Sequence, residues 1–227
     1  MSAVAQLTIS RNLIFTDDPD MYKNVSELIS SKDYPVENHI VETQDGYVLQ
    51  IQRIPYGRNG TREANKQVVF IMHGLLSSSN DWVINFPKQT LSFILADAGY
   101  DLWMGNGRGN VYSKKHKNYT TDMAEFWNFS FDEFAKYDIP AMIDFILKKT
   151  GQEELFFIGH SQGNTAGFAL LSERQEYNKK IKLLIALGPV TTLIHTSGPL
   201  KYIAPLTHLG EVLSIIHYTV NCIRNVY

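Results

Sequence analysis

The chain has 227 residues, enough for one sizeable hydrophobic core, and its 44% hydrophobic and 19% charged residues are typical of a globular protein. The formal net charge of −2 at pH 7 provides no excess of basic residues for nucleic acid. No apolar run approaches the roughly 20 residues that cross a membrane as a helix. The composition therefore predicts one main globular domain, with neither a nucleic-acid partner nor a transmembrane segment.

The N-terminal part of the sequence predicts a short helix and a hairpin. We expect residues 1–18 to be poorly ordered, and they lack the basic and apolar regions of a signal peptide. Asp18-Pro19 would start a helix that ends at Ser30, because proline suits the first helical position. Val36–Glu42 and Tyr47–Ile54 are predicted strands, joined by a turn that contains glycine.

Apolar strands alternate with helical patterns between residues 67 and 189. The run Val68–Met72 is continuously apolar, as expected for a strand that is covered on both faces. Further strands are predicted at Tyr100–Met104, Leu155–Ile158 and Ile181–Leu187, and a helix at Lys88–Ala98. This alternation predicts a mostly parallel, doubly wound α/β sheet, to which the N-terminal hairpin adds an antiparallel edge.

A capping box marks the start of another predicted helix. Ser130 and Glu133 have the Ser-x-x-Glu spacing in which each side chain bonds the other residue's backbone N–H. The helix would run to about Lys149 and bend at Pro140, whose ring cannot continue the hydrogen-bond ladder.

The sequence changes in character after Pro189. Residues 190–227 are apolar, contain scattered histidines and show no clear strand. Apolar residues recur at helical spacing in Glu211–Ile223. This predicted helix either packs on the domain or begins a cap over an active site, and the pattern leaves both open. The lone cysteine, Cys222, cannot form an internal disulfide.

A Gly-x-Ser-x-Gly pattern occupies residues 159–163. An apolar strand precedes it and a helix-forming run follows it, which is the arrangement of a nucleophile elbow. Ser161 would then be a nucleophile that attacks an ester or another acyl group. Gly159 and Gly163 would lie where the backbone is crowded.

An oxyanion hole needs two backbone N–H groups that point to the developing negative charge. At a nucleophile elbow one N–H comes from the next residue, here Gln162, and the other from the loop after an earlier strand. That loop is His73-Gly74-Leu75-Leu76, and Leu75 is the best-placed residue. Because His73 precedes the nucleophile in the chain, we expect it to brace this loop and not to act as a base.

The chain after Ser161 offers poor candidates for a catalytic acid and base. It contains 66 residues and no aspartate, and its carboxylates are Glu173, Glu176 and Glu211. The first two would lie roughly 15 Å or more along a helix from Ser161. The later histidines are His195, His208 and His217, and no predicted core strand positions them. His160 should point away from its neighbour, so we expect neither a triad acid nor a triad base in this chain.

The glycine-rich segment Gly105–Asn110 is a weak candidate for a phosphate-binding loop. The third glycine of a dinucleotide motif would fall at position 110, which is asparagine, and no Lys-Ser or Lys-Thr pair follows. We predict a tight structural turn at the end of a strand.

Four Asn-x-Ser/Thr sequons occur, at Asn24, Asn59, Asn118 and Asn128. This pattern has low specificity, and Asn128 lies close to apolar residues of the kind that a core buries. Together the sequons favour a secretory ancestry.

These motifs together resemble the acid lipases, the α/β-hydrolase family of gastric and lysosomal lipases and their insect relatives. The resemblance covers residues 19–190 and extends more loosely to the end. The segments that carry it are Asn24–Ile29, Val41–Leu49, Arg53–Gly57, His73–Leu76, Asp101–Asn110, Phe126–Glu133 and Gly159–Gly163. Gly107 stands where relatives often carry a serine.

The resemblance implies an α/β-hydrolase fold, with residues 19–189 as the N-terminal part of its core and 190–227 as the start of a cap. It implies a serine ester hydrolase of neutral lipids such as triacylglycerols or sterol esters, secreted or lysosomal, with no metal or organic cofactor. Ser161 maps onto the nucleophile, and Leu75 and Gln162 onto the oxyanion-hole amides.

Family members continue through a cap to the late strands that carry the triad aspartate and histidine. We therefore expect this chain to be a truncated form with little activity of its own. The alternative is a non-catalytic truncated fold that binds lipid or a protein partner through its apolar C-terminal segment.

Overall fold

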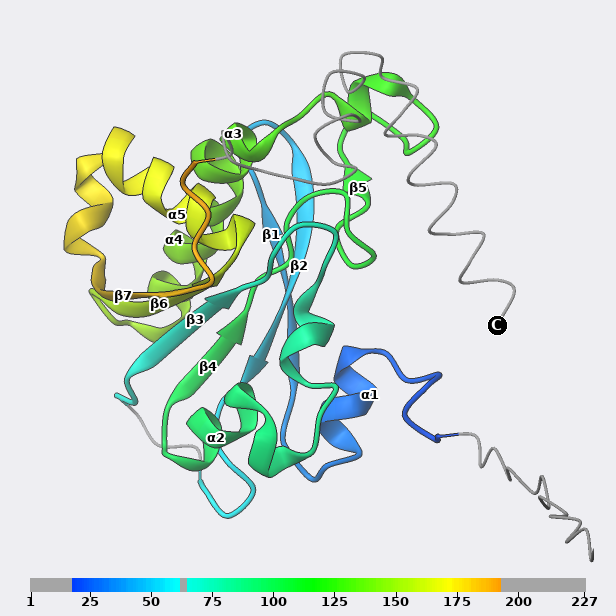
Figure 1. The fold of residues 1–227 in the computed structure, drawn as a ribbon, viewed down its shortest axis with the longest axis vertical. Helices are drawn as coiled ribbons and strands as arrows, with labels where there is room; N and C mark the ends of the chain where they lie inside the picture. The colour runs from blue at the N-terminus through cyan, green and yellow to red at the C-terminus, as the bar shows by residue number, and fades with distance from the viewer. Residues whose placement is uncertain (1–17, 62–64, 193–227) are drawn as a thin grey trace, which may run out of the picture.

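One mixed β-sheet organises residues 18–61 and 65–192, which are the residues that this computed structural model describes. The strands are β1 (Glu37–Glu42), β2 (Tyr47–Ile54), β3 (Val68–Met72), β4 (Asp101–Met104), β5 (Lys115–His116), β6 (Leu155–His160) and β7 (Ile181–Leu187). Their order is β1-β2-β4-β3-β6-β7, and β5 pairs with β2. The hairpin β1–β2 is antiparallel, as are the pairings of β2 with β4 and β5, whereas β4, β3, β6 and β7 are mutually parallel (Figure 1). The predicted α/β sheet with an antiparallel N-terminal hairpin is confirmed.

Helices cover both faces of the sheet (Figure 1). They are α1 (Val25–Ser30), α2 (Leu91–Asp97), α3 (Phe131–Glu133), α4 (Ile139–Thr150), α5 (Gln162–Glu173) and the π-helical turn η4 (Phe134–Asp138). The connections hold the 3-10 turns η1 (Ser79–Trp82), η2 (Pro87–Gln89), η3 (Ala124–Trp127) and η5 (Gln175–Lys179).

The central strand β3 contributes to two hydrophobic cores. Val68, Phe70 and Met72 belong to the core on the side of α4 and α5. Val69 and Ile71 belong to the core on the side of α1 and α2. Successive side chains of a strand point to opposite faces, so a strand between two cores is apolar throughout. This is why the run was recognisable in the sequence.

Helix α1 begins at Val25, so the predicted start at Asp18-Pro19 was wrong. Its N-cap is Asn24, whose side chain accepts hydrogen bonds from the backbone N–H groups of Ser26 and Glu27. The Glu27 carboxylate in turn accepts the Asn24 N–H at 2.8 Å. A proline is only compatible with the first turn of a helix, whereas this reciprocal pair of hydrogen bonds satisfies backbone N–H groups that would otherwise lack partners.

The helix predicted from Ser130 to Lys149 exists, but it is divided. The capping box of Ser130 and Glu133 is present, and α3 then widens into the π-helical turn before α4 begins. Pro140 lies in the first turn of α4, where its missing N–H costs least. The irregularity that we assigned to Pro140 therefore begins before it, at the π turn.

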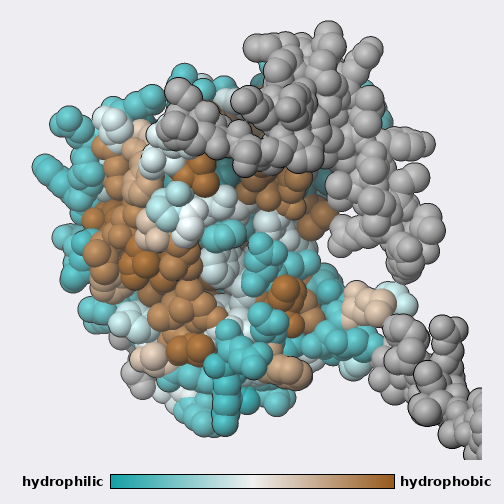
Figure 2. Space-filling view, in the orientation of Figure 1, coloured by the Kyte–Doolittle hydropathy of each residue, from teal (hydrophilic) through white to brown (hydrophobic). Residues whose placement is uncertain are grey.

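The outer strand β7 exposes apolar side chains. Within the described residues it pairs with β6 alone, and Leu183 and Ile185 are 51% and 40% exposed. Figure 2 shows hydrophobic surface gathered over this end of the sheet, where β6 and β7 lie in Figure 1. A strand edge of this kind can pair with further backbone.

All four sequon asparagines are exposed: Asn24, Asn59, Asn118 and Asn128. Asn128 is exposed although Phe126, two residues before it, is fully buried. The predicted helix Glu211–Ile223 and Cys222 lie outside the described residues, as does the N-terminal segment up to residue 17. No helix in the described ranges has the length and apolarity to cross a membrane.

A buried ionic cluster joins the glycine-rich loop after β4 to the helical layer. The Arg108 guanidinium bonds Asp45 at 2.6 Å and Asp138 at 2.7 Å, and it lies 3.9 Å above the Tyr47 ring. The Arg108 side chain is 1% exposed and that of Asp138 is fully buried. Burial would lower the pKa of Arg108, but the Asp138 and Asp45 carboxylates outweigh it and raise that pKa, which keeps the guanidinium charged.

Removing Arg108 should be far more costly than removing an exposed partner of an ion pair. We expect Arg108→Ala to lower the free energy of unfolding by about 3–5 kcal/mol, because two carboxylates lose their counter-charge in a buried site. Lys182 pairs with Glu154 at 2.7 Å with both side chains nearly half exposed, so Lys182→Ala should cost less than about 1 kcal/mol. Urea denaturation measures both losses of unfolding free energy. Equal losses would show that the buried Arg108 cluster stabilises the fold no more than an exposed ion pair does.

Candidate active site

Ser161 occupies a strained turn between β6 and α5. Its φ of 49° and ψ of −115° are rare for a residue with a side chain. Its backbone N–H donates to the Leu187 carbonyl at 3.0 Å, which ties the turn to the end of β7. Strain of this kind persists where the surrounding structure enforces it, and it is concentrated at functional sites.

The two glycines that flank Ser161 lie against backbone that leaves no room for a side chain. A Cβ on Gly159 would come within 2.4 Å of the Asn164 side-chain oxygen and 2.9 Å of its backbone nitrogen. A Cβ on Gly163 would lie 2.8 Å from the carbonyl oxygens of both Met72 and His73. The first turn of α5 can therefore approach the end of β6 because position 159 is glycine, and the end of β3 because position 163 is glycine.

The loop His73–Leu76 runs directly beside Ser161. A Cβ on Gly74 would lie 3.2 Å from the Ser161 Cβ and 3.0 Å from the His160 ring. Leu76 has a φ of 57°, so the backbone reverses just after Leu75. The structure thus brings the predicted oxyanion-hole loop and the predicted nucleophile together.

The His73 ring links this loop to the glycine-rich loop after β4 by hydrogen bonds. Its Nδ1 lies 2.8 Å from the Gly74 carbonyl, and its Nε2 lies 3.1 Å from both the Gly107 N–H and the Asn110 amide nitrogen. Burial is the main reason that the pKa of His73 is lowered from its usual value of 6.5, and the nearby His160 acts in the same direction. A neutral ring with these three partners has the bracing role that we expected.

The glycine-rich loop Gly105–Asn110 is a tight turn on which aromatic rings pack. A Cβ on Gly107 would lie 2.1 Å from the Phe134 ring, and a Cβ on Gly109 would lie 2.9 Å from Phe129. Asn106 is fully buried, and its amide nitrogen donates to the Gln50 carbonyl and the Gln52 side chain. These contacts support the structural-turn interpretation and explain the glycines by packing.

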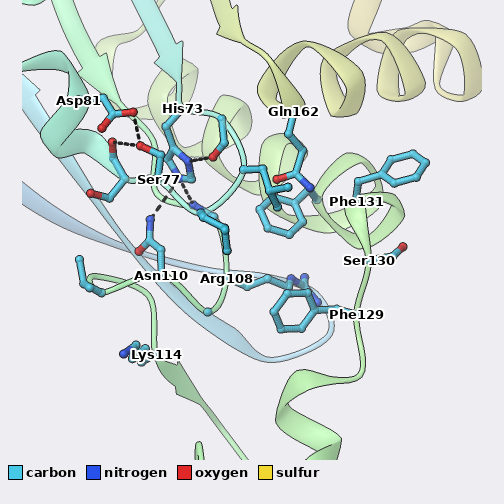
Figure 3. Close-up of a pocket in the computed structure, with 18 of the residues that line it drawn as sticks. His73, Ser77, Asp81, Arg108, Asn110, Lys114, Phe129, Ser130, Phe131 and Gln162 are labelled. Carbon is cyan, nitrogen blue, oxygen red and sulfur yellow. Dashed lines mark hydrogen bonds between the residues drawn. The ribbon is translucent and has the colours of Figure 1, made fainter. Parts of the chain in front are cut away.

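A pocket of about 530 Å³ lies between this turn, the loop after β3 and the start of α5. Its aromatic wall consists of Trp127, Phe129, Phe131 and Phe134, and its other apolar lining residues are Leu75, Leu76 and Val111. Figure 3 shows Gln162 extending from α5 toward the pocket, on the same side as Phe131. Leu75 and Gln162, the two predicted sources of oxyanion-hole N–H groups, thus line one cavity.

No acid or base reaches Ser161 among residues 18–61 and 65–192. Within these ranges no hydrogen bond joins its hydroxyl to another side chain. Glu173 ends α5, and Glu176 pairs with Arg174 at 2.9 Å. His160 is exposed, and its ring lies edge-on to Trp82. The other candidates, Glu211, His195, His208 and His217, lie outside the described residues.

Two residues that anchor the elbow, Asn164 and Thr165, had no recognisable signal in the sequence. The Asn164 amide donates to the Leu187 carbonyl at 2.9 Å, and the Thr165 hydroxyl donates to the Val190 carbonyl at 2.6 Å. Polar residues in the first turn of a helix are common, so neither stood out. The described part of the chain contains no cluster of three or more potential metal ligands.

The packing of Phe134 on Gly107 predicts a coupled pair. We expect Gly107→Ala to cost about 1–3 kcal/mol of unfolding free energy, because the ring must move from its place in a filled site. In a Phe134→Ala background the same substitution should cost much less. A double-mutant cycle by urea denaturation measures this coupling. Additive losses of unfolding free energy would show that the Phe134 ring is not what excludes a side chain at position 107.

The neutral state of His73 predicts a loss of stability in acid. Well above pH 6.5 the ring is neutral in both the folded and unfolded chains, so there it does not contribute to the pH dependence of stability. As the pH falls below about 6.5, the unfolded chain binds a proton that the folded chain binds only at its lower pKa, and stability decreases. NMR titration of the ring should give a pKa below 6.5, and His73→Asn should remove this part of the pH dependence. A ring pKa at or above 6.5 would contradict the burial argument.

Two family models match the chain. Residues 25–86 match the partial alpha/beta-hydrolase lipase region, and residues 67–209 match the alpha/beta hydrolase fold. The second match alone spans more than half of the chain, and it includes both the His73–Leu76 loop and the elbow.

Curated relatives share about half of their residues with this chain over the aligned region. Human lysosomal acid lipase/cholesteryl ester hydrolase is 51% identical over 190 residues, which are 83% of this chain and 48% of the relative. Mouse gastric triacylglycerol lipase is 50% identical over 188 residues, which are 82% of this chain and 48% of the relative. Mouse lipase member K is 47% identical over 191 residues, which are 84% of this chain and 48% of the relative. The chain thus spans about half the length of these relatives.

Solved structures support the fold. A bacterial membrane phospholipase A superposes with a TM-score of 0.53 at 13% identity, covering 79% of this chain and 47% of that one. An esterase from Pyrococcus furiosus superposes with a TM-score of 0.51 at 20% identity, covering 72% and 55%. Because the alpha/beta hydrolase model matches residues 67–209, more than half of the chain, the chain belongs to the α/β-hydrolase fold family, and the relatives that it resembles at about 50% identity are lysosomal and gastric lipases.

Proposed function

We propose that this chain carries the nucleophile and the oxyanion hole of a serine lipase that hydrolyses neutral lipid esters, such as triacylglycerols or sterol esters. The observation that supports this most directly is the strained Ser161 turn with the Gly74 backbone packed against it. In this proposal residues 19–189 form the N-terminal part of the hydrolase core, and residues 190–227 begin a cap.

The proposed roles follow from where charge develops during acyl transfer. The Ser161 hydroxyl attacks the ester carbonyl carbon, and the carbonyl oxygen becomes an oxyanion. The N–H of Gln162 is the first of α5, so it has no acceptor within the helix and can donate to that oxygen. The N–H of Leu75 supplies the second donor from the neighbouring loop. Backbone donors that are already oriented contribute several kcal/mol to such a step.

The pocket suits an apolar acyl group. Four aromatic side chains and the aliphatic side chains of Leu75 and Leu76 line it beside the elbow. Leu75 and Leu76 are 59% and 77% exposed, so apolar surface continues to the rim. The relatives whose names include lysosomal and gastric lipases support an ester of this kind and a secreted or lysosomal location.

Ester turnover by this chain should be weak, because no acid or base lies beside Ser161 in the described ranges. A serine without its triad partners keeps only the acceleration from binding and the oxyanion hole. The alternative is a non-catalytic hydrolase fold that binds lipid or a protein partner. The apolar β7 edge favours it, since Leu183 and Ile185 are exposed.

A fluorophosphonate probe tests the proposed nucleophile. We expect slow, stoichiometric labelling of Ser161 that Ser161→Ala abolishes and Ser77→Ala preserves, because Ser77 lines the same pocket without an elbow. Hydrolysis of p-nitrophenyl butyrate should be at least about a thousandfold slower than for a full-length acid lipase.

Labelling that survives Ser161→Ala would exclude Ser161 as the nucleophile. Turnover near that of a full-length lipase, lost in Ser161→Ala, would show that an acid and a base are present after all. Binding to triacylglycerol emulsions that is equal in wild type and Ser161→Ala, without any labelling, would support the non-catalytic alternative.

A further inference from the structure

We propose that His73 is a positioning residue whose ring fixes the Gly74–Leu75 peptide, so that the Leu75 N–H is directed toward the oxyanion position beside Ser161. This inference rests on the proposed function, in which that N–H is an oxyanion-hole donor. It concerns a contact within the loop, however, and can be tested separately from activity.

The partners of His73 determine where its proton lies. The backbone N–H of Gly107 can only donate, and it lies 3.1 Å from Nε2. Nε2 must therefore present its lone pair, and the Asn110 amide nitrogen, also at 3.1 Å, donates to the same atom. The proton of the neutral ring is then on Nδ1, which donates to the Gly74 carbonyl at 2.8 Å.

The bonded carbonyl sets the direction of the next N–H. In a trans peptide the C=O and N–H bonds point in opposite directions across one plane, and the described residues contain no cis peptide. Holding the Gly74 oxygen on the His73 side therefore turns the Leu75 N–H away from the ring. Standard backbone geometry places the Leu75 nitrogen about 2.4 Å from the Gly74 Cα. The side of that Cα where a side chain would stand faces the Ser161 Cβ.

Other constraints on this peptide are few. Gly74 and Leu75 belong to neither a strand nor a helix, and the same is true of their neighbours His73 and Leu76. Leu76 already has a positive φ, so the loop stores strain that a rotation of the 74–75 peptide could redistribute. A hydrogen bond from a buried ring is the contact that selects one orientation.

The ring itself is held from the opposite side. The Asn110 amide nitrogen also donates to the Asn106 oxygen at 2.9 Å, and that oxygen accepts the Ser79 N–H at the same distance. Between these residues, the Arg108 N–H donates to Asp138 at 2.9 Å. The glycine-rich loop thus acts as a fixed support for His73, and the glycine at position 107 leaves room for the Phe134 ring.

Two substitutions separate the two sides of the ring. In His73→Asn the side-chain amide can take the place of Nδ1 and donate to the Gly74 carbonyl. In His73→Gln the longer side chain can take the place of Nε2 and accept from Gly107, which leaves the Gly74 carbonyl unheld. Both variants remove the imidazole, so a general bracing role predicts similar losses for both.

Leu75 can be observed directly, because Gly74-Leu75 is the only Gly-Leu pair in the sequence. Labelling glycine with ¹³C at the carbonyl and leucine with ¹⁵N therefore isolates its amide signal in NMR. We expect one sharp signal in wild type and His73→Asn, and a shifted or doubled signal in His73→Gln. The phosphonylation rate of Ser161 should fall about 10–100-fold in His73→Gln, at unchanged probe affinity, and much less in His73→Asn.

An unchanged Leu75 signal in folded His73→Gln would overturn the proposal, as would equal rate losses in both variants. If the variants do not fold, the ¹⁵N shifts of the wild-type ring decide, since a proton on Nε2 would contradict the proposed contact. Absence of Ser161 labelling in wild type would count against the proposed function, and the Leu75 signal would still decide whether His73 holds the peptide.

Discussion

The site depends on how closely the first turn of α5 can approach the end of β3. At Gly163 the carbonyl oxygens of Met72 and His73 occupy the space that a Cβ would need. This contact places the helix start, and with it Ser161, beside the loop that leaves β3. If the helix stood farther away, the Gly74 backbone and the serine would no longer be neighbours. The constraint is steric and local, and the rest of the sheet serves to hold its two sides in place.

The sheet could be predicted from the sequence because its strands lie between two cores. Burial on both faces makes Val68–Met72 continuously apolar, and turn residues set its limits. The start of α1 was mispredicted because Asp18-Pro19 and Asn24 both resemble helix starts. Only the second has a glutamate three residues later that completes a reciprocal cap. The π turn before α4 had no recognisable sequence signal, since ordinary helix-forming residues occupy it.

The parts of the candidate site that depend on backbone conformation were predictable from the sequence. The parts that depend on contacts between distant side chains were less so. Gly159–Gly163 and His73–Leu76 stand out because backbone geometry restricts which residues fit. The aromatic wall is different, because Phe134 and Gly107 are far apart in the chain and meet only in the fold. The same holds for the two partners of the His73 Nε2 atom, Gly107 and Asn110, which come from a loop more than 30 residues later.

One carbonyl group has a mechanical consequence. The Leu187 oxygen accepts both the Ser161 N–H and the Asn164 amide, so Ser161 and the first turn of α5 are tethered to the last residue of β7. Thr165 extends this tether to Val190. The backbone conformation at residues 187–190 and the conformation of the Ser161 turn are therefore coupled, and a displacement of one would displace the other.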